Sequence, residues 1–180
     1  MKPKYPRLHH AVNLATQWHT GQDRKYSQTP YIIHPLRVME IVRSVSNDED
    51  MLIAAVLHDV VEDTEIELIR IREEFGENVE SLVADLTDIA TSEHGNRKAR
   101  KLMDREHTAQ ASPDAKTIKL ADLIDNTESI VRCDPHFSLI YMNEKERLLE
   151  VLTEGDSQLW ARAHTLLQEY QTNRLQEALR

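Results

Sequence analysis

The segment "AAVLHDVVEDT", from Ala54 to Thr64, decides the fold. It begins like the middle of a buried helix and then turns polar at His58 and Asp59, and again at Glu62 and Asp63. Carboxylates gathered at the C-terminal end of a helix oppose the helix macrodipole, so something must offset their charge. A divalent cation would do so. Taken alone, the motif also fits a solvated helix end with His58 in the core.

A later segment, "KTIKLADLIDNTESI" at residues 116–130, places more polar groups in an apolar helix. Asp122 and Asn126 are i, i+4 neighbours and share a face. A buried carboxylate without a partner is costly, so Asp122 either faces solvent or requires a cation or several donors.

His34 stands just before Pro35, which suits the first position of a helix. The combined set has two imidazoles and two carboxylates, which suit a divalent ion such as Mn²⁺, Fe²⁺, Co²⁺ or Zn²⁺; its members are His34, His58, Asp59 and Asp122. No thiolate accompanies them, which argues against a structural zinc site.

The rest of the chain is predicted to be helical. Only four glycines and six prolines occur in 180 residues, which indicates long helices with few tight turns. Apolar periodicity and capping residues predict nine helices, at about residues 8–20, 36–45, 48–61, 64–76, 78–87, within 87–110, 113–133, 137–151 and 156–179. The predicted fold is therefore all-α, a single-domain irregular bundle of about nine helices. The last of these helices either closes the core, the preferred interpretation, or pairs with a second subunit.

Charge and composition narrow the function. Lys and Arg total 22 against 31 Asp and Glu, a formal charge of -9, which disfavours nucleic-acid binding but not a small phosphate-bearing ligand in a local basic pocket. The single cysteine cannot form an internal disulfide. Because the sequence shows neither a signal peptide nor a membrane-spanning run, we expect a soluble cytoplasmic protein that does not bind membranes.

The ordered pattern of His34, the His58–Asp59 pair and a later Asp122 resembles the metal-binding signature of HD-domain phosphohydrolases. Its flanking segments, "RKYSQTPYIIHPLRV", "AAVLHDVVEDT", "FGENVESLVADLTD" and "KLADLIDN", are similar to the hydrolase domain of the Rel/Spo alarmone enzymes and most of all to stand-alone small alarmone hydrolases. The resemblance covers about residues 7–155. It implies one HD hydrolase domain over residues 1–180, closed by a C-terminal helix at 156–179.

The resemblance also implies roles for single residues. One Mn²⁺ would be held by His34, His58, Asp59 and Asp122. Glu62 and Asp63 match an acidic pair placed beside the attacking water. Nucleotide contacts would come from Arg24 and Lys25 in the basic loop and from Asn126 and Ser129 on the later helix.

The activity so implied is Mn²⁺-dependent hydrolysis of the 3′-pyrophosphate of (p)ppGpp, (p)ppApp or both, by a monomer or homodimer. Two departures concern nucleotide recognition: the loop "YSQTPY" lacks a glycine, and Glu128 stands where relatives often carry arginine. The preferred base therefore stays open. Another HD-type nucleotidase or pyrophosphatase, or a non-catalytic nucleotide sensor, are the alternatives. The basic segment from Asn96 to Arg105 is either a wall over a polyphosphate or a solvated helix face.

Overall fold

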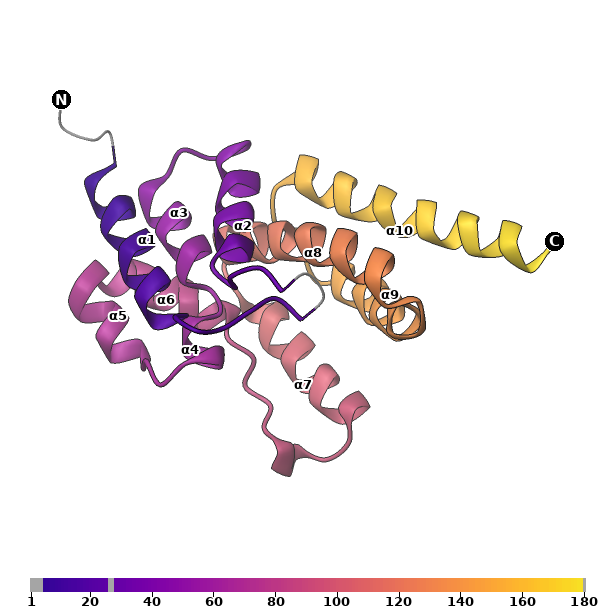
Figure 1. Ribbon diagram of the computed structural model, residues 1–180, viewed down its shortest axis with the longest axis horizontal. Coiled ribbons are helices and arrows are strands. Elements are labelled where there is room, and N and C mark those ends of the chain that lie inside the picture. The colour runs from indigo at the N-terminus through magenta and orange to yellow at the C-terminus, as the bar shows by residue number, and fades with distance from the viewer. Residues whose placement is uncertain (1–4, 26–27, 180) are drawn as a thin grey trace.

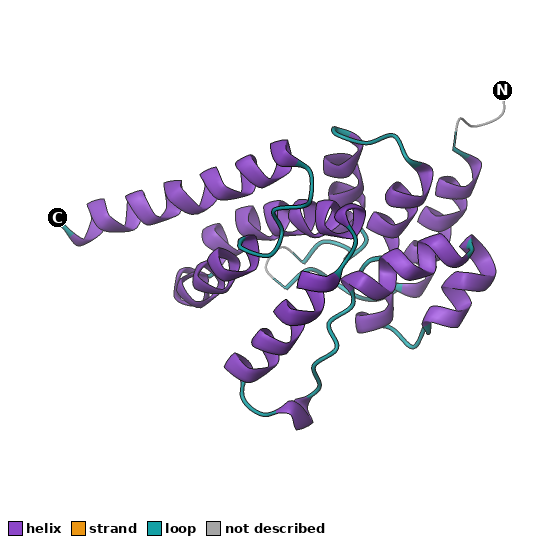
Figure 2. Ribbon diagram, turned by 180° about the vertical axis from the view of Figure 1, so that it is seen from behind, coloured by secondary structure: helices purple, strands orange, loops and turns teal. Residues whose placement is uncertain are grey.

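The computed structural model describes residues 5–25 and 28–179, so Tyr26 and Ser27 of the predicted basic loop lie outside the described residues. The described residues contain ten α-helices, one short 3₁₀-helix and no strand, which confirms the all-α prediction (Figures 1 and 2). The helices are α1 (Pro6–Trp18), α2 (Ile33–Arg43), α3 (Glu49–Leu57), α4 (Val60–Asp63), α5 (Leu68–Phe75), α6 (Glu77–Leu86), α7 (Arg97–Gln110), α8 (Pro113–Cys133), α9 (Pro135–Leu149) and α10 (Ser157–Ala178), with the 3₁₀-helix η1 (Ser92–His94) before α7.

Helix α8 is the central element of the bundle. It packs against α2, α3 and α6 on one side and against α9 and α10 on the other, as Figure 1 shows. Its start follows the sequence prediction, because Pro113 occupies the first turn and the Ser112 hydroxyl accepts a hydrogen bond from the Ala115 amide. Covered on two sides, α8 buries polar residues as well as apolar ones.

Helix α3 supplies the other part of the core. Every residue from Met51 to Leu57 is buried, and the Asp48 side chain, at the predicted start of this helix, caps it by accepting from the Met51 amide. Val60, beyond the end of α3, is also fully buried. Burial of these apolar side chains fixes the position of the polar residues that lie between Leu57 and Val60.

The predicted helix over residues 48–61 is in fact two helices. His58 and Asp59 form a turn between α3 and α4, with Asp59 at φ −97° and ψ −5°. This sparsely populated backbone region is common at active sites. The break accounts for ten helices where the sequence predicts about nine, because hydrophobic periodicity continues smoothly across it.

Two local predictions at helix ends are wrong. Thr64 does not begin the next helix; its hydroxyl donates to the Val60 carbonyl and so closes α4, while α5 starts at Leu68. Helix α2 begins at Ile33, which places His34 inside its first turn rather than ahead of it. Pro35 is tolerated there because the first turn of a helix leaves its amide groups unpaired. Gly76, by contrast, ends α5 in a positive-φ conformation, as the sequence indicates.

The first half of α10 packs against α8 and α9 through buried Leu159, Ala163 and Leu167. Its last turns extend away from the bundle, where Leu175 is 67% exposed (Figure 1). No helix among the described residues combines the length and the apolar character needed to cross a lipid bilayer.

We predict that Gly155→Ala destabilises the junction between α10 and α8. A Cβ at this position would lie 2.8 Å from Leu120 Cδ1 and 3.1 Å from backbone atoms of Lys116 and Thr117. Relieving this overlap should cost about 1–3 kcal/mol of unfolding free energy, measured by urea denaturation. Ser157→Ala, at an exposed position two residues later, should change it by less than about 0.5 kcal/mol. An unfolding curve of Gly155→Ala that matches the wild type would contradict this packing.

Candidate functional site

The four residues predicted as metal ligands meet at one point. His34 comes from α2, His58 and Asp59 from the turn between α3 and α4, and Asp122 from the middle of α8. The Nε2 atom of His34 lies 3.2 Å from Asp122 Oδ1 and 3.5 Å from Asp59 Oδ2. The Nε2 atom of His58 lies 3.1 Å from Asp59 Oδ2 and 3.7 Å from Asp122 Oδ1. Three elements distant in sequence therefore converge on these four side chains.

Both imidazoles turn the same nitrogen toward this cluster. His34 Nδ1 lies 2.7 Å from Asp125 Oδ2, and His58 Nδ1 lies 2.9 Å from the Ala55 carbonyl oxygen. Each Nδ1 faces an acceptor and carries the proton of the neutral imidazole, so in that neutral form the Nε2 lone pair is free. His58 Nε2 is buried and has no hydrogen-bond partner among the described residues. A buried nitrogen lone pair of this kind is an available metal ligand.

The donor set fits a divalent ion. One ligand atom from each of His34, His58 and Asp59 lies within 4.8 Å of the other two. Imidazole and carboxylate ligands bind such ions at about 2.0–2.2 Å, so two ligands at right angles are about 3 Å apart. The nitrogen–oxygen distances of 3.1–3.7 Å are close to that spacing. The cluster could therefore hold a metal ion with modest adjustment.

The electrostatics of the cluster also call for a cation. Burial lowers the pKa of His58, but Asp59 and Asp122 raise it by more, so the net pKa is well above the ordinary value. Burial raises the pKa of Asp122, but the nearby imidazoles of His34 and His58 lower it by more. The carboxylates are thus held ionised and draw positive charge to themselves. A divalent ion satisfies the same demand with neutral imidazoles.

A second layer of contacts holds the ligands in place. The Tyr31 hydroxyl donates to Asp59 Oδ2 at 2.5 Å, and Asn126 Nδ2 donates to Asp122 Oδ1 at 2.6 Å. Lys119 Nζ lies 3.7 Å from Asp122 Oδ2. Asp125, which orients His34, is 6% exposed and is missing from the predicted site. The sequence signal that points to it is a carboxylate in the same apolar stretch, three residues after Asp122.

Glu62 and Asp63 follow the cluster on α4. Glu62 Oε1 accepts a hydrogen bond from the Asp88 amide at 2.7 Å. Partial desolvation of the carboxyl group, followed by the negative charge of Asp88, raises the pKa of Glu62 to about 7. The residue as a whole is exposed, so water screens part of this effect. Burial, followed by the charge of Asp59, also raises the pKa of Asp63. Glu62 is thus suited to exchange a proton near neutral pH.

Three of the four predicted nucleotide contacts, Arg24, Asn126 and Ser129, touch one another, whereas Lys25 lies beside Phe137. Arg24 donates to Asn126 Oδ1 through both terminal nitrogens at 3.2 Å, and to the Ser129 hydroxyl at 3.1 Å. Lys25 Nζ lies 5.6 Å from the centre of the Phe137 ring. The loop before α2 is thereby held against α8 and α9.

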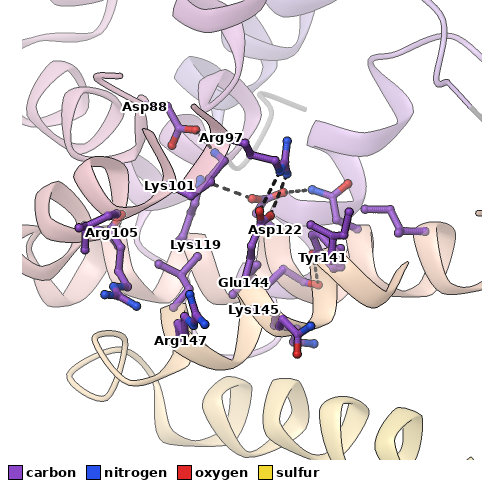
Figure 3. Close-up of a pocket in the computed structure, with 18 of the residues that line it drawn as sticks. Asp88, Arg97, Lys101, Arg105, Lys119, Asp122, Tyr141, Glu144, Lys145 and Arg147 are labelled. Carbon is purple, nitrogen blue, oxygen red and sulfur yellow. Dashed lines mark hydrogen bonds and ion pairs between the residues drawn. The ribbon is translucent and has the colours of Figure 1, made fainter. Parts of the chain in front are cut away.

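A cavity of about 900 Å³ opens beside Asp122 and Asn126 (Figure 3). Helices α7, α8 and α9 form its walls, and cations predominate among its charged lining residues, which are Arg97, Lys98, Lys101, Arg105, Lys119, Lys145 and Arg147 against Asp88, Asp122 and Glu144. Four of the cations belong to the segment from Asn96 to Arg105, which favours the interpretation of that segment as a basic wall. Glu62 lines a smaller cavity that shares Asp88, Arg97 and Lys101 with the large one.

The helical fold and the His-Asp cluster are those of an HD domain. The family model described as "HD domain" matches residues 11–137, and the chain belongs to this family. Among curated relatives, the guanosine-3′,5′-bis(diphosphate) 3′-pyrophosphohydrolase MESH1 of Xenopus tropicalis is 39% identical over 128 residues, covering 69% of this chain and 70% of the relative. The Homo sapiens protein of the same name is 37% identical over 132 residues, covering 72% of each chain.

Solved structures show the same relationship. A structure described as a metazoan ortholog of SpoT that hydrolyzes ppGpp and plays a role in starvation responses superposes with a TM-score of 0.83. It is 29% identical and covers 94% of this chain and 98% of its own. The resemblance to Rel/Spo-type hydrolases that the sequence motifs indicate is thereby confirmed.

We predict that Glu62 titrates well above the ordinary glutamate value of 4.5 in the metal-free protein, toward pH 7. A carboxyl group whose pKa is raised by folding contributes stability below pH 4.5, and this contribution is lost as pH rises through 7. Carboxyl ¹³C chemical shifts of labelled glutamate would measure the midpoint, with Glu62→Gln identifying the signal. Because the Lys119 cation lowers this pKa, Lys119→Met should shift the midpoint further upward. A midpoint at or below 4.5 would contradict the assigned environment.

Proposed function

We propose that this protein is a metal-dependent hydrolase that removes the 3′-pyrophosphate from guanosine-3′,5′-bis(diphosphate), its adenosine counterpart or both. The observation that carries the proposal is the His34–His58–Asp59–Asp122 cluster, with the unpartnered His58 Nε2, beside a cavity with a basic lining. The names of the curated relatives supply the substrate class. The products would be pyrophosphate and a nucleoside 5′-diphosphate with a free 3′-hydroxyl.

The metal in this proposal is Mn²⁺, held by the four clustered side chains. When bound, such an ion lowers the pKa of water and polarises a phosphoryl oxygen. The protein contributes fixed ligand orientations, because Asp125 and the Ala55 carbonyl set the tautomers of the two imidazoles and Tyr31 holds Asp59. Lys119, beside Asp122, would offset negative charge on the phosphate group.

Glu62 and Asp63 are the proposed acid–base pair. Attack of a water molecule on the 3′-phosphorus requires removal of a proton, and breakage of the ester bond requires that a proton reach the 3′-oxygen. A carboxylate with a pKa near 7 can take up the first proton at neutral pH and release it again. Because the two groups are adjacent, they would share this task as a coupled pair.

Arg24, Lys25, Asn126 and Ser129 are the proposed nucleotide contacts. Arg24 already donates to Asn126 and Ser129, so binding of a nucleotide would exchange these internal hydrogen bonds for contacts with the ligand. Such an exchange loses few hydrogen bonds and keeps the loop near α8. The charge of Arg24 would then meet the ribose or a phosphate rather than the side chains of Asn126 and Ser129.

The direct test is to incubate the Mn²⁺-loaded protein with 3′-pyrophosphorylated guanosine and adenosine nucleotides. Pyrophosphate and the nucleoside 5′-diphosphate should appear in equal amounts. Orthophosphate in place of pyrophosphate would point to another HD-type phosphatase activity. Absence of turnover with the metal bound would overturn the proposal and favour a nucleotide-binding role.

Glu62→Gln separates catalysis from metal binding. It should lower kcat by about 10²–10⁴-fold, the usual contribution of an acid–base group, while metal affinity stays unchanged. Glu65→Gln, at an exposed position three residues later, removes the same charge away from the site and should keep full activity. Asp59→Ala should instead abolish metal binding, measured by calorimetry. Full activity of Glu62→Gln would refute the acid–base assignment.

Asp125→Asn tests the proposed orienting contact. The amide oxygen can still accept from His34, but the negative charge is lost, so the imidazole becomes a weaker ligand. Mn²⁺ affinity, measured by chelator competition without nucleotide, should fall about 10- to 100-fold. Asp114→Asn, in the exposed first turn of the same helix, is the matched control and should leave the affinity unchanged. Equal affinities for both variants would show that Asp125 does not tune the site.

A further inference from the structure

Lys145 is a buried cation without a countercharge. The residue is 1% exposed and sits on α9 opposite α8. Its ammonium group donates to the Thr127 hydroxyl at 2.9 Å, and no carboxylate of the described residues lies within 4.0 Å of it. The Thr127 hydroxyl donates its own hydrogen bond to the Leu123 carbonyl. Lys145 therefore keeps two N–H groups for which the described residues offer no acceptor.

An ammonium group in this position is costly for the fold. Transfer of an unpaired charge from water into an apolar interior is strongly unfavourable, and proteins normally supply a partner. Burial lowers the pKa of Lys145 to about 8, so the group is still mostly charged at neutral pH. A residue with this cost and no structural ion pair suggests a partner from outside the chain.

The surroundings identify the charge of that partner. Lys145 lines the large cavity (Figure 3), and of the other cations there, Arg97, Lys101 and Lys119 are paired with carboxylates. Three further cations have no acidic partner within the described part of the chain: Lys98, Arg105 and Arg147. Together with Lys145 they make four cations in the cavity without a countercharge. An anionic group is the ligand that this distribution favours.

The position of Lys145 relative to the metal cluster suggests which anion. Thr127 and Asp122 both belong to α8, five residues apart, which corresponds to about 7.5 Å along the helix axis and about 140° around it. Asp122 and Lys145 nevertheless line the same cavity. A nucleotide with phosphate chains on its 3′- and 5′-oxygens carries two anionic groups separated by one ribose. The cluster end of the site is rich in carboxylates and accepts an anion through a metal, whereas the Lys145 end can accept one directly.

We propose that Lys145, positioned by Thr127, is a binding residue for the 5′-diphosphate of the nucleotide whose 3′-pyrophosphate lies at the metal cluster. This inference rests on the proposed function. Lys98, Arg105 and Arg147 at the wall of the cavity add long-range attraction, while Lys145 makes the desolvated, charge-assisted hydrogen bond. The protein would thereby distinguish nucleotides by their 5′-phosphate chain.

The test compares Lys145→Met with Lys98→Met, which removes the same charge from an exposed position on the cavity wall. Guanosine 5′-diphosphate and guanosine 3′-monophosphate are titrated by calorimetry into the Mn²⁺-loaded proteins. Lys145→Met should weaken binding of the 5′-diphosphate by roughly 10- to 100-fold, the effect of losing one charged hydrogen bond. Binding of the 3′-monophosphate should change less than about twofold, and Lys98→Met should change either affinity less than about threefold.

Thermal unfolding distinguishes this role from a structural one. Removal of a buried, unpaired charge should leave the melting temperature of Lys145→Met equal to or above that of the wild type. A lower melting temperature with equal losses for both nucleotides, or an unchanged 5′-diphosphate affinity, would overturn the inference. If Lys145→Met does not fold, Thr127→Val takes its place, because it leaves the ammonium group unpositioned and should selectively weaken 5′-diphosphate binding.

These measurements do not depend on turnover. A wild-type protein that binds the 5′-diphosphate through Lys145 but hydrolyses no 3′-pyrophosphorylated nucleotide would refute the proposed function and leave the anion site. A protein that hydrolyses such nucleotides with the same KM in the wild type and in Lys145→Met would refute the anion site alone.

Discussion

The burial of two carboxylates in the central helix is the constraint that shapes this protein. Asp122 and Asp125 are each about 6–7% exposed in the middle of α8, where unpaired charges would be prohibitively costly. His34 contacts both, and Lys119, Asn126 and Arg24 surround them from the same helix and from the loop before α2. The packing of α2 and α3 on α8 is therefore tied to the compensation of these charges.

Helix ends with a side-chain cap or a proline could be predicted from sequence. Asp48 and Ser112 cap α3 and α8 at the helix starts predicted near residues 48 and 113, and Asp134 ends α8 before Pro135. The break at His58 and Asp59 could not, because no glycine or proline marks it. Tertiary contacts decide it: buried Leu57 and Val60 on either side anchor the turn, and Tyr31 and His34 hold Asp59. The helix start predicted at Thr64 is wrong for a related reason, because a threonine hydroxyl can either cap the following helix or bond the last carbonyls of the preceding one.

The proposed ligands could be identified from the sequence because imidazoles and carboxylates are unusual within apolar helices. Asp125 and Lys145 escaped prediction because an apolar stripe identifies only one buried face of a helix. Helix α8 is covered by α2 and α3 on one side and by α9 and α10 on the other, so polar residues on more than one face are buried. Periodicity alone cannot distinguish such a residue from one that faces solvent.

The charge of the whole chain conceals how its charges are arranged. The net charge of -9 would repel a nucleotide polyphosphate, yet the cavity beside Asp122 has seven cations and three carboxylates in its lining. The excess acidic residues lie elsewhere, and the carboxylates at the cluster draw in a cation. Along α8 the proposed metal site is thus followed within two turns by a cation-lined space. Two neighbouring sites of opposite preference suit a ligand that brings one anionic group to a metal and another to the protein's own ammonium and guanidinium groups.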